Sequence, residues 1–230
     1  MIPNVVPARL KAWHLALGLS FFFQACAPAY IPNAVNVPMH QEKGEVAAAV
    51  NYGTSGFDPQ VSYAITDNVG AMLNASFRND PIDTNNNYHR HLFVEGGLGL
   101  FKWTNENMVL ECYGGFGYGN INAHMENSLF TSTAKVNGSR IFLQPSVGFK
   151  WKNADLALVN RFALVDLRQG NERASALFTE PVLSIRVGTE QIKLVIQTGI
   201  SIPLHEGLAF AYQPFLINLG LHIRPGKFTL

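Results

Sequence analysis

Charged residues are scarce in this chain, and no long apolar run follows residue 30. Only 14% of its 230 residues are charged and the formal net charge is +1, so the composition gives no reason to expect nucleic acid as a partner. Soluble domains usually carry about a quarter charged residues. Because a spanning helix needs ~20 continuous apolar residues, the mature chain would have to cross a membrane as strands.

Cysteine is almost absent as well, since Cys26 and Cys112 are the only two. A disulfide between them would tie the extreme N-terminus to the middle of a strand pattern, which argues against a disulfide framework. Cys112 is most simply a small hydrophobic residue. The length leaves room for an export signal and one domain.

The first 26 residues have the pattern of an export signal. Arg9 and Lys11 precede the apolar stretch 15–23, and Ala25-Cys26 follows it. A basic region before a short apolar one is typical of a secretory signal, and a cysteine directly after a small residue stands where bacterial lipoproteins are acylated. We expect a signal peptide over 1–25 and lipidation of Cys26.

The alternative is ordinary signal-peptidase cleavage after Ala29, because Ala27-Pro28-Ala29 has the small-x-small form. In either case three prolines, Pro28, Pro32 and Pro38, exclude a helix from the residues that follow. Residues 26–43 are therefore predicted to be a lipidated N-terminus and an extended tether.

Cys26, Pro28, Tyr30, Pro32 and Asn33 form a Cys-x-Pro-x-Tyr-x-Pro-Asn opening, which Glu-Lys-Gly-Glu follows at 42–45. This opening resembles that of Bacteroidota-type outer-membrane β-barrel lipoproteins. The resemblance implies an acylated N-terminus, the bacterial outer membrane as location and a barrel as fold. It implies no particular chemistry.

From Gly44 to the C-terminus the dominant pattern is period-two alternation, which predicts strands with two different faces. Several of these strands reach the length that a tilted strand needs to cross a bilayer. The fold class is therefore all-β, an up-and-down antiparallel transmembrane barrel over 44–230. Its ten expected strands cover residues 45–52, 59–66, 69–78, 89–102, 108–119, 140–151, 155–166, 178–188, 192–202 and 213–224.

Tight and long connections alternate along this pattern, so one rim of the barrel should hold the tight turns and the other the long loops. Both termini should then lie on the tight-turn side, where a lipid-anchored N-terminus also belongs. The tight turns are 66–68, 104–107, 152–154 and 189–191, and the long loops are 79–88, 120–139, 167–177 and 203–212.

Each strand has an apolar face and a polar one. The apolar face, with Leu98, Leu143 and Leu194, carries no charge. Many glycines and nearly balanced charges favour the polar face as the interior; its members include Glu95, Glu111, Arg140, Gln144, Lys150, Arg161, Glu180, Arg186, Lys193 and Gln197. The inverse alternative is a soluble lipocalin-like barrel that holds a hydrophobic ligand.

Residues that carry chemistry form no recognisable catalytic spacing. His89, His91 and Glu95 have the composition of a two-histidine, one-carboxylate metal site, but a hydrated polar rim explains them more simply. We therefore predict no catalytic residue, metal or cofactor. By analogy with barrel enzymes, an outer-rim activity on lipid or peptide is an alternative, with rim candidates Asp58, Asp80, Asp83, His89, Asp166 and His205.

The sequence thus predicts a lipid-anchored, non-enzymatic outer-membrane barrel with a filled lumen. Its partners would be outer-membrane lipid and a protein bound by the long loops, especially 120–139.

Overall fold

The computed structural model describes residues 27–126 and 131–227. The predicted signal peptide, residues 1–25, and the predicted lipidation site Cys26 lie outside the described residues. The described part contains no helix long and apolar enough to cross a membrane. Its strands are β1 (Glu45–Gly53), β2 (Gly56–Ala64), β3 (Val69–Asn79), β4 (Tyr88–Trp103), β5 (Met108–Glu126), β6 (Thr131–Lys150), β7 (Ala154–Gln169), β8 (Glu172–Gly188), β9 (Ile192–Ile200), β10 (Ile202–Pro203) and β11 (Phe215–Lys227).

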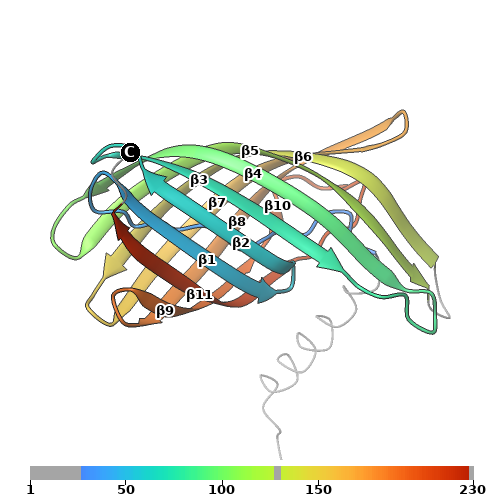
Figure 1. The fold of residues 1–230 in the computed structure, drawn as a ribbon. Helices are drawn as coiled ribbons and strands as arrows, with labels where there is room; N and C mark the ends of the chain where they lie inside the picture. Colours follow the sequence, from blue (N-terminus) through green and yellow to red (C-terminus); the bar gives the residue numbers. More distant parts are fainter. Residues whose placement is uncertain (1–26, 127–130, 228–230) are drawn as a thin grey trace, which may run out of the picture.

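Ten of these strands form one closed antiparallel up-and-down barrel (Figure 1), which confirms the predicted fold class. Each strand pairs with the next along the chain, and β11 pairs with both β9 and β1 to close the ring. The short β10 pairs with β8 beyond the end of β9. The alternation fixes the register, because a slip by one residue would turn every inward charge outward.

The burial pattern confirms the assignment of the two faces. Leu98, Leu143 and Leu194 are exposed on the outside, whereas Arg140, Arg161 and Glu180 are buried inside. A lipocalin-like barrel needs the opposite arrangement, with the apolar face inside, so that alternative does not describe this chain.

Glycines make room inside the narrow barrel. A Cβ atom on Gly99 would lie 2.4 Å from the ring of Tyr113, and one on Gly70 would lie 2.4 Å from its hydroxyl oxygen. The large buried Tyr113 side chain therefore depends on two strand positions without side chains.

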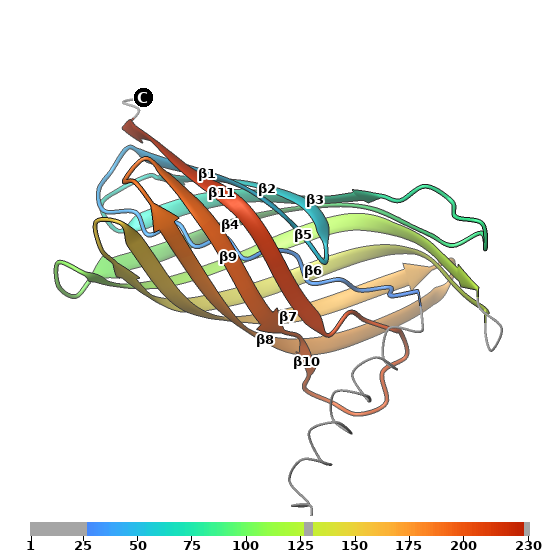
Figure 2. The ribbon, with the colours of Figure 1, turned by 90° about the horizontal axis from the view of Figure 1, so that it is seen from below.

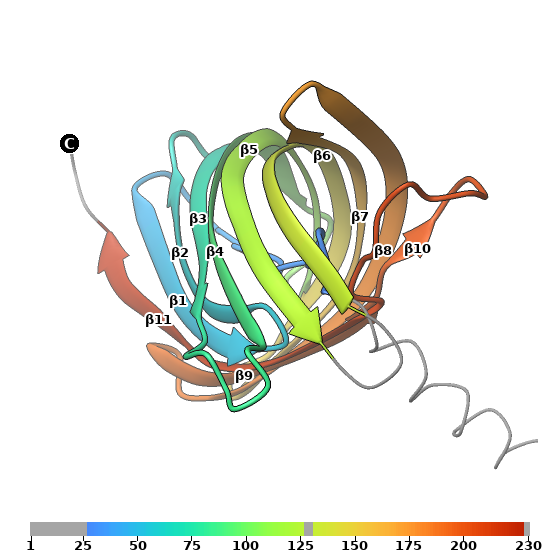
Figure 3. The same ribbon diagram turned by 90° about the vertical axis from the view of Figure 1, so that its right-hand side faces the viewer.

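The connections divide the barrel into a turn rim and a loop rim. The turn rim holds residues 65–68, 104–107, 151–153 and 189–191, close to the predicted tight turns. The loop rim holds 54–55, 80–87, 170–171 and 201–214. Seen end-on, the strands enclose a continuous ring at this rim (Figure 3).

The prediction of long loops over 120–139 and 167–177 is wrong. Residues 120–126 and 131–139 continue β5 and β6 as a paired ladder, and β7 and β8 continue to a two-residue turn at 170–171. These continuations project beyond the neighbouring strands at the loop rim (Figure 1). We call their loop-rim ends the extension, which comprises residues 120–126, 131–139, 166–169 and 172–176.

The extension keeps the alternation of the barrel but reverses its polarity. Ile121, Ala123, Val136 and Leu167 are buried on its inside, while its outside is polar and includes Asn120, Thr133, Lys135, Arg168 and Arg173. In the rest of the barrel the charged residues lie inside, beside apolar ones such as Phe101 and Val159, and the outside is apolar.

Residues 27–43, which we call the luminal segment, do not lie outside the barrel as a tether. They are extended, as the prolines predict, but they run through the interior of the barrel (Figures 2 and 3). Ala34, Val35 and Val37 are at most 2% exposed. The ends of the barrel domain, Glu45 and Lys227, lie at the turn rim as expected, but Ala27 lies at the loop rim, which corrects the expected position of the N-terminus.

Candidate functional site

The candidate site is the contact between the luminal segment and the inward side chains of the strands, where buried polar groups from both are hydrogen bonded to each other. It has three levels along the barrel: a charged level toward the loop rim, an amide-rich level in the middle and a second charged level toward the turn rim.

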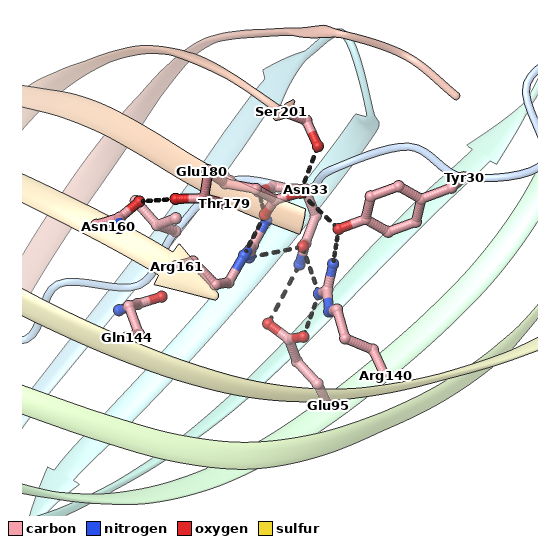
Figure 4. Close-up of polar contacts among 12 residues, drawn as sticks. Tyr30, Asn33, Glu95, Arg140, Gln144, Asn160, Arg161, Thr179, Glu180 and Ser201 are labelled. Carbon is pink, nitrogen blue, oxygen red and sulfur yellow. Dashed lines mark hydrogen bonds and ion pairs between the residues drawn. The ribbon is translucent and has the colours of Figure 1, made fainter. Parts of the chain in front are cut away.

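The loop-ward level contains two buried ion pairs, one across β5 and one between the adjacent strands β7 and β8 (Figure 4). Arg140 of β6 pairs with Glu95 of β4, and Arg161 of β7 pairs with Glu180 of β8, with 2.6 Å between Nε and Oε2. All four side chains are at most 3% exposed. Charges removed from water in this way are stable only when they are paired and fully hydrogen bonded.

Asn33 of the luminal segment bridges these two ion pairs. Its side-chain oxygen accepts hydrogen bonds from Arg140 at 2.6 Å and from Arg161 at 3.0 Å, and its amide donates to Glu95 at 3.4 Å. Its main-chain oxygen accepts from Arg161 at 3.1 Å. One asparagine therefore contacts both cations and one of the carboxylates (Figure 4).

Tyr30 completes the same level. Its hydroxyl donates to Glu180 at 2.6 Å and accepts from Arg140 at 3.2 Å, and the Ser201 hydroxyl donates to Glu180 at 2.9 Å. The ring of Tyr30 packs on Phe178, with 4.9 Å between centroids. Two motif residues, Tyr30 and Asn33, thus bind the interior of the barrel.

In the middle level, side chains satisfy the backbone of a segment that has no strand partner there. Gln197 accepts from the Val35 amide at 3.0 Å and donates to the Val35 carbonyl at 2.8 Å. Gln144 donates to the Asn36 carbonyl at 2.7 Å. Asp58 accepts from the Ala34 amide at 2.7 Å. Buried backbone groups need such partners, and these amide and carboxylate groups provide them.

The turn-ward level repeats the charged pattern. Lys193 pairs with Asp155 at 2.6 Å, and Arg186 donates to the Val37 carbonyl. Glu111 accepts from the Met39 amide at 2.9 Å, and Arg224 donates to the Met39 carbonyl at 3.0 Å. The nearly balanced interior charges therefore bind each other and the luminal segment, while Lys150 lies at the turn rim and bonds Gln41.

Strand pairing also brings Ser76 of β3 to His89 and His91 of β4. The Ser76 hydroxyl lies 3.0 Å from Nε2 of His91, and Nδ1 of His91 lies 2.9 Å from Nε2 of His89. This is the order of a nucleophile, a base and an orienting group. The cavity beside Ser76 and His91, however, has a volume of about 30 Å³, room for one or two water molecules but not for an acyl substrate.

The metal-site hypothesis is not supported by the geometry. Glu95 is directed to Arg140 and Asn33, away from the histidine pair. Among residues 27–126 and 131–227, no three histidine, cysteine or acidic side chains form a group that could hold a metal ion.

The remaining rim candidates are dispersed. Asp58 lies inside and binds the luminal segment, whereas Asp166 lies on the extension and pairs with Arg173 at 2.7 Å. Asp80 pairs with Arg78 at 2.8 Å, and His205 is exposed in the 201–214 connection. Cys112 is on the outer face of β5.

A larger open cavity of about 500 Å³ lies at the loop rim. The N-terminal residues Ala27, Pro28 and Ile31 form one side, and residues of the 80–87 loop form another. Asp83 orders that loop, because its carboxylate accepts from the amides of Asn85 and Asn87, each at 2.8 Å.

Neither the scan against protein-family models nor the search of curated proteins found a match for this chain. Its function has to be argued from its own geometry.

Proposed function

We propose that this chain is a lipid-anchored barrel of the bacterial outer membrane with a non-enzymatic role, and that its own N-terminal segment closes its lumen. The observation that carries the proposal is the outer surface of the strands. A belt of outward residues without charge surrounds the barrel, while charged residues within the same stretches of the strands, such as Glu95 and Arg161, are buried inside.

The height of this belt matches a bilayer. On β4, β7 and β9 the uncharged outward positions cover residues 92–100, 156–164 and 192–200, which agrees with the ~9–11 residues of a tilted membrane-spanning strand. On β4 the exposed cations Arg90 and Lys102 lie at its two ends. An apolar surface of this extent on a protein in water would be an aggregation hazard.

Two polar groups in the belt are paired with each other on the surface itself. Asn160 of β7 and Thr179 of β8 both face outward, and the Thr179 hydroxyl donates to the Asn160 side chain at 2.9 Å. Such pairing lowers the cost of placing these groups in hydrocarbon.

Site-specific labelling tests the proposed location. In a Cys112→Ala background, cysteines introduced at Leu143 or Leu194 should react poorly with a water-soluble maleimide. The fluorescence of a dye attached to either cysteine should be quenched by a lipid-borne spin label. Cysteines at Gln144 or Gln197, one residue along the same strands, should not be reached by the lipid-borne label. If the lipid-borne label reaches 144 and 197 but not 143 and 194, the membrane proposal is wrong.

The closed lumen has a separate test. The luminal segment binds all three levels of the interior, so the barrel in planar bilayers should show no large, stable conductance. A steady open channel in the intact chain would contradict this part of the proposal and leave the location intact.

The role proposed for this barrel is structural or that of a surface contact. The polar outside of the extension replaces the expected coil loops as the surface for a partner protein, because it is the largest part of the barrel wall that lies beyond the belt.

A further inference from the structure

The luminal segment has a defined direction through the barrel. At its N-terminal end the Ala29 amide donates to the Ala211 carbonyl at 2.8 Å, and the Gln213 amide donates to the Tyr30 carbonyl at 2.9 Å. Both partners belong to the 201–214 connection at the loop rim. At its C-terminal end the Lys43 amide donates to Asp67 at 2.8 Å, at the turn rim. The segment therefore crosses the whole belt before β1 begins.

Apolar packing and charge both hold the segment in this position. Ala27, Ala29 and Tyr30 belong to the apolar cluster inside the extension, while Val35, Val37 and Met39 belong to a second cluster deeper in the barrel. Withdrawal of the segment would also remove Asn33 from two buried arginines. A buried charge that loses its partners is strongly destabilising, so we expect the segment to stay in place.

We infer from this threading that the lipid anchor joins the membrane at the loop rim, on the opposite side from β1. The inference rests on the proposed function, in which Cys26 is acylated and the barrel spans the outer membrane. Cys26 directly precedes Ala27, and consecutive Cα atoms are ~3.8 Å apart. The acyl group is therefore attached close to the position of Ala27 at the loop rim. The hydrocarbon core is ~30 Å thick, and no acyl group at that position can reach the leaflet on the turn side.

In outer-membrane barrels the short turns face the periplasm and the longer connections face outward. With that insertion, the acyl chains on Cys26 enter the outward-facing leaflet, and the partner of the N-terminus is lipid of the cell surface. The chain is then a surface lipoprotein whose anchor and barrel are joined by a segment that passes through its own lumen.

The threading also constrains assembly. The barrel closes where β11 pairs with β1, and β1 follows the luminal segment directly. After closure the N-terminal end would have to pass through a lumen that inward side chains fill, so we expect the segment to lie between the strands before this last pairing is complete.

Two double-cysteine variants of the full chain, each in the Cys112→Ala background, test the threading. In Ala29→Cys with Ala211→Cys, the backbone hydrogen bond between these residues implies Cα atoms close enough for a disulfide. Oxidation should give a mobility shift in gel electrophoresis that reduction removes. The matched control, Ala29→Cys with Glu106→Cys at the turn rim, should show no shift.

Labelling of intact cells with a membrane-impermeant maleimide tests the leaflet. Cysteine at Asn85, exposed in the loop-rim connection 80–87, should react in intact cells, whereas cysteine at Glu106 should react only after the cells are broken. Mass spectrometry of the same samples reports acylation of Cys26.

The outcomes separate the two proposals. The 29–211 disulfide in an acylated protein labelled at 85 supports the surface anchor. An acylated, membrane-inserted protein that forms no 29–211 disulfide, or that is labelled at 106 instead of 85 in intact cells, overturns the inference and leaves the membrane location standing. A chain that is neither acylated nor membrane-inserted overturns the proposed function itself.

Discussion

The belt and the extension are built from the same strands in the same alternation, yet their polarities are opposite. Within the belt, Phe116 and Tyr118 of β5 are exposed on the outer face of the barrel, and Glu111 is buried on the inner face. A few residues later Ile121 and Ala123 are buried inside the extension, and the outside becomes polar at Asn120. The backbone is continuous, and in the proposed membrane location this change of polarity coincides with a change of surroundings, from apolar to aqueous outside.

The interior changes at the same height. Inside the belt the luminal segment is bound through side-chain charges and amides, at Asn33 and Gln197 for example, in addition to the apolar packing of Val35 and Val37. Inside the extension Ala27 and Ala29 are held by apolar packing and by a backbone hydrogen bond, without charged or amide side chains. Polar burial with exact pairing gives specificity of position, while apolar packing tolerates small shifts. The belt should therefore fix the register of the segment.

The largest expected effect comes from an ion pair inside the belt. Arg140→Met leaves Glu95 buried without its cation and removes a donor to Tyr30 and Asn33. We expect a loss of about 3–5 kcal/mol in the free energy of unfolding, measured by urea titration in detergent or lipid.

The matched control is the exposed pair on the extension. Arg173 is 62% exposed where it pairs with Asp166, so Arg173→Met should cost at most about 1 kcal/mol. The double variant Arg140→Met with Glu95→Gln should recover part of the first loss. Equal costs for the two arginine variants would contradict the difference between the zones.

The outer face gives the next largest effect. Leu143→Arg places a charge in the middle of the belt and should destabilise the inserted barrel by about 2–4 kcal/mol. Thr133→Arg lies on the same side of β6, but on the extension, and should change stability by no more than about 0.5 kcal/mol. Unfolding in lipid vesicles measures the free energy of both variants. A similar loss for Thr133→Arg would mean that the belt extends toward the loop rim as far as residue 133.

The sequence predicted the belt well and the extension poorly, for one physical reason. Alternation identifies a strand, but on β5 the apolar positions move from the outward Phe116 and Tyr118 to the inward Ile121 and Ala123. In a period-two pattern that shift indicates the end of a strand, so the sequence predicts a loop over 120–139. The same shift occurs on β7 between the outward Leu164 and the inward Leu167, so the sequence also predicts a long loop over 167–177 in place of the short turn at 170–171.

The site was predictable in its residues but not in its contacts. The inward charges followed from alternation, and the prolines correctly excluded a helix from the luminal segment. Its place inside the barrel depends on Asn33 meeting Arg140 and Arg161, which are 107 and 128 residues away. The proximity of Ser76 to His91 likewise requires the β3–β4 register, in which Arg78 is opposite His91.

A smaller effect tests whether the belt fixes the position of the luminal segment. Asn33→Leu removes the acceptor that Arg140 and Arg161 share and leaves their N–H groups with fewer partners. The expected cost is about 1–3 kcal/mol. Ala29 lies where the luminal segment passes inside the extension. Ala29→Gly should lower the free energy of unfolding by less, because the backbone hydrogen bonds of that residue persist. Urea titrations compare them, and an equal or larger loss at position 29 would assign the fixing role to the extension.

The smallest effect is local and concerns the loop rim, outside the belt. Hydrogen bonds from the backbone of Asn87, and then of Asn85, hold the pKa of the Asp83 carboxyl below its usual value. Because this pKa is lower in the folded chain, the contribution of Asp83 to loop order is fully present above the ordinary aspartate pKa of ~3.9. It is lost as the pH falls through the folded value.

Amide NMR signals of Asn85 and Asn87 in micelles should therefore shift at acidic pH, while those of the luminal segment stay constant through the onset of that shift. In Asp83→Asn the acid shift should disappear. If the signals of Asn85 and Asn87 move together with those of the luminal segment, the loop rim is not independent of the belt, and the division of the barrel into two zones fails at this end.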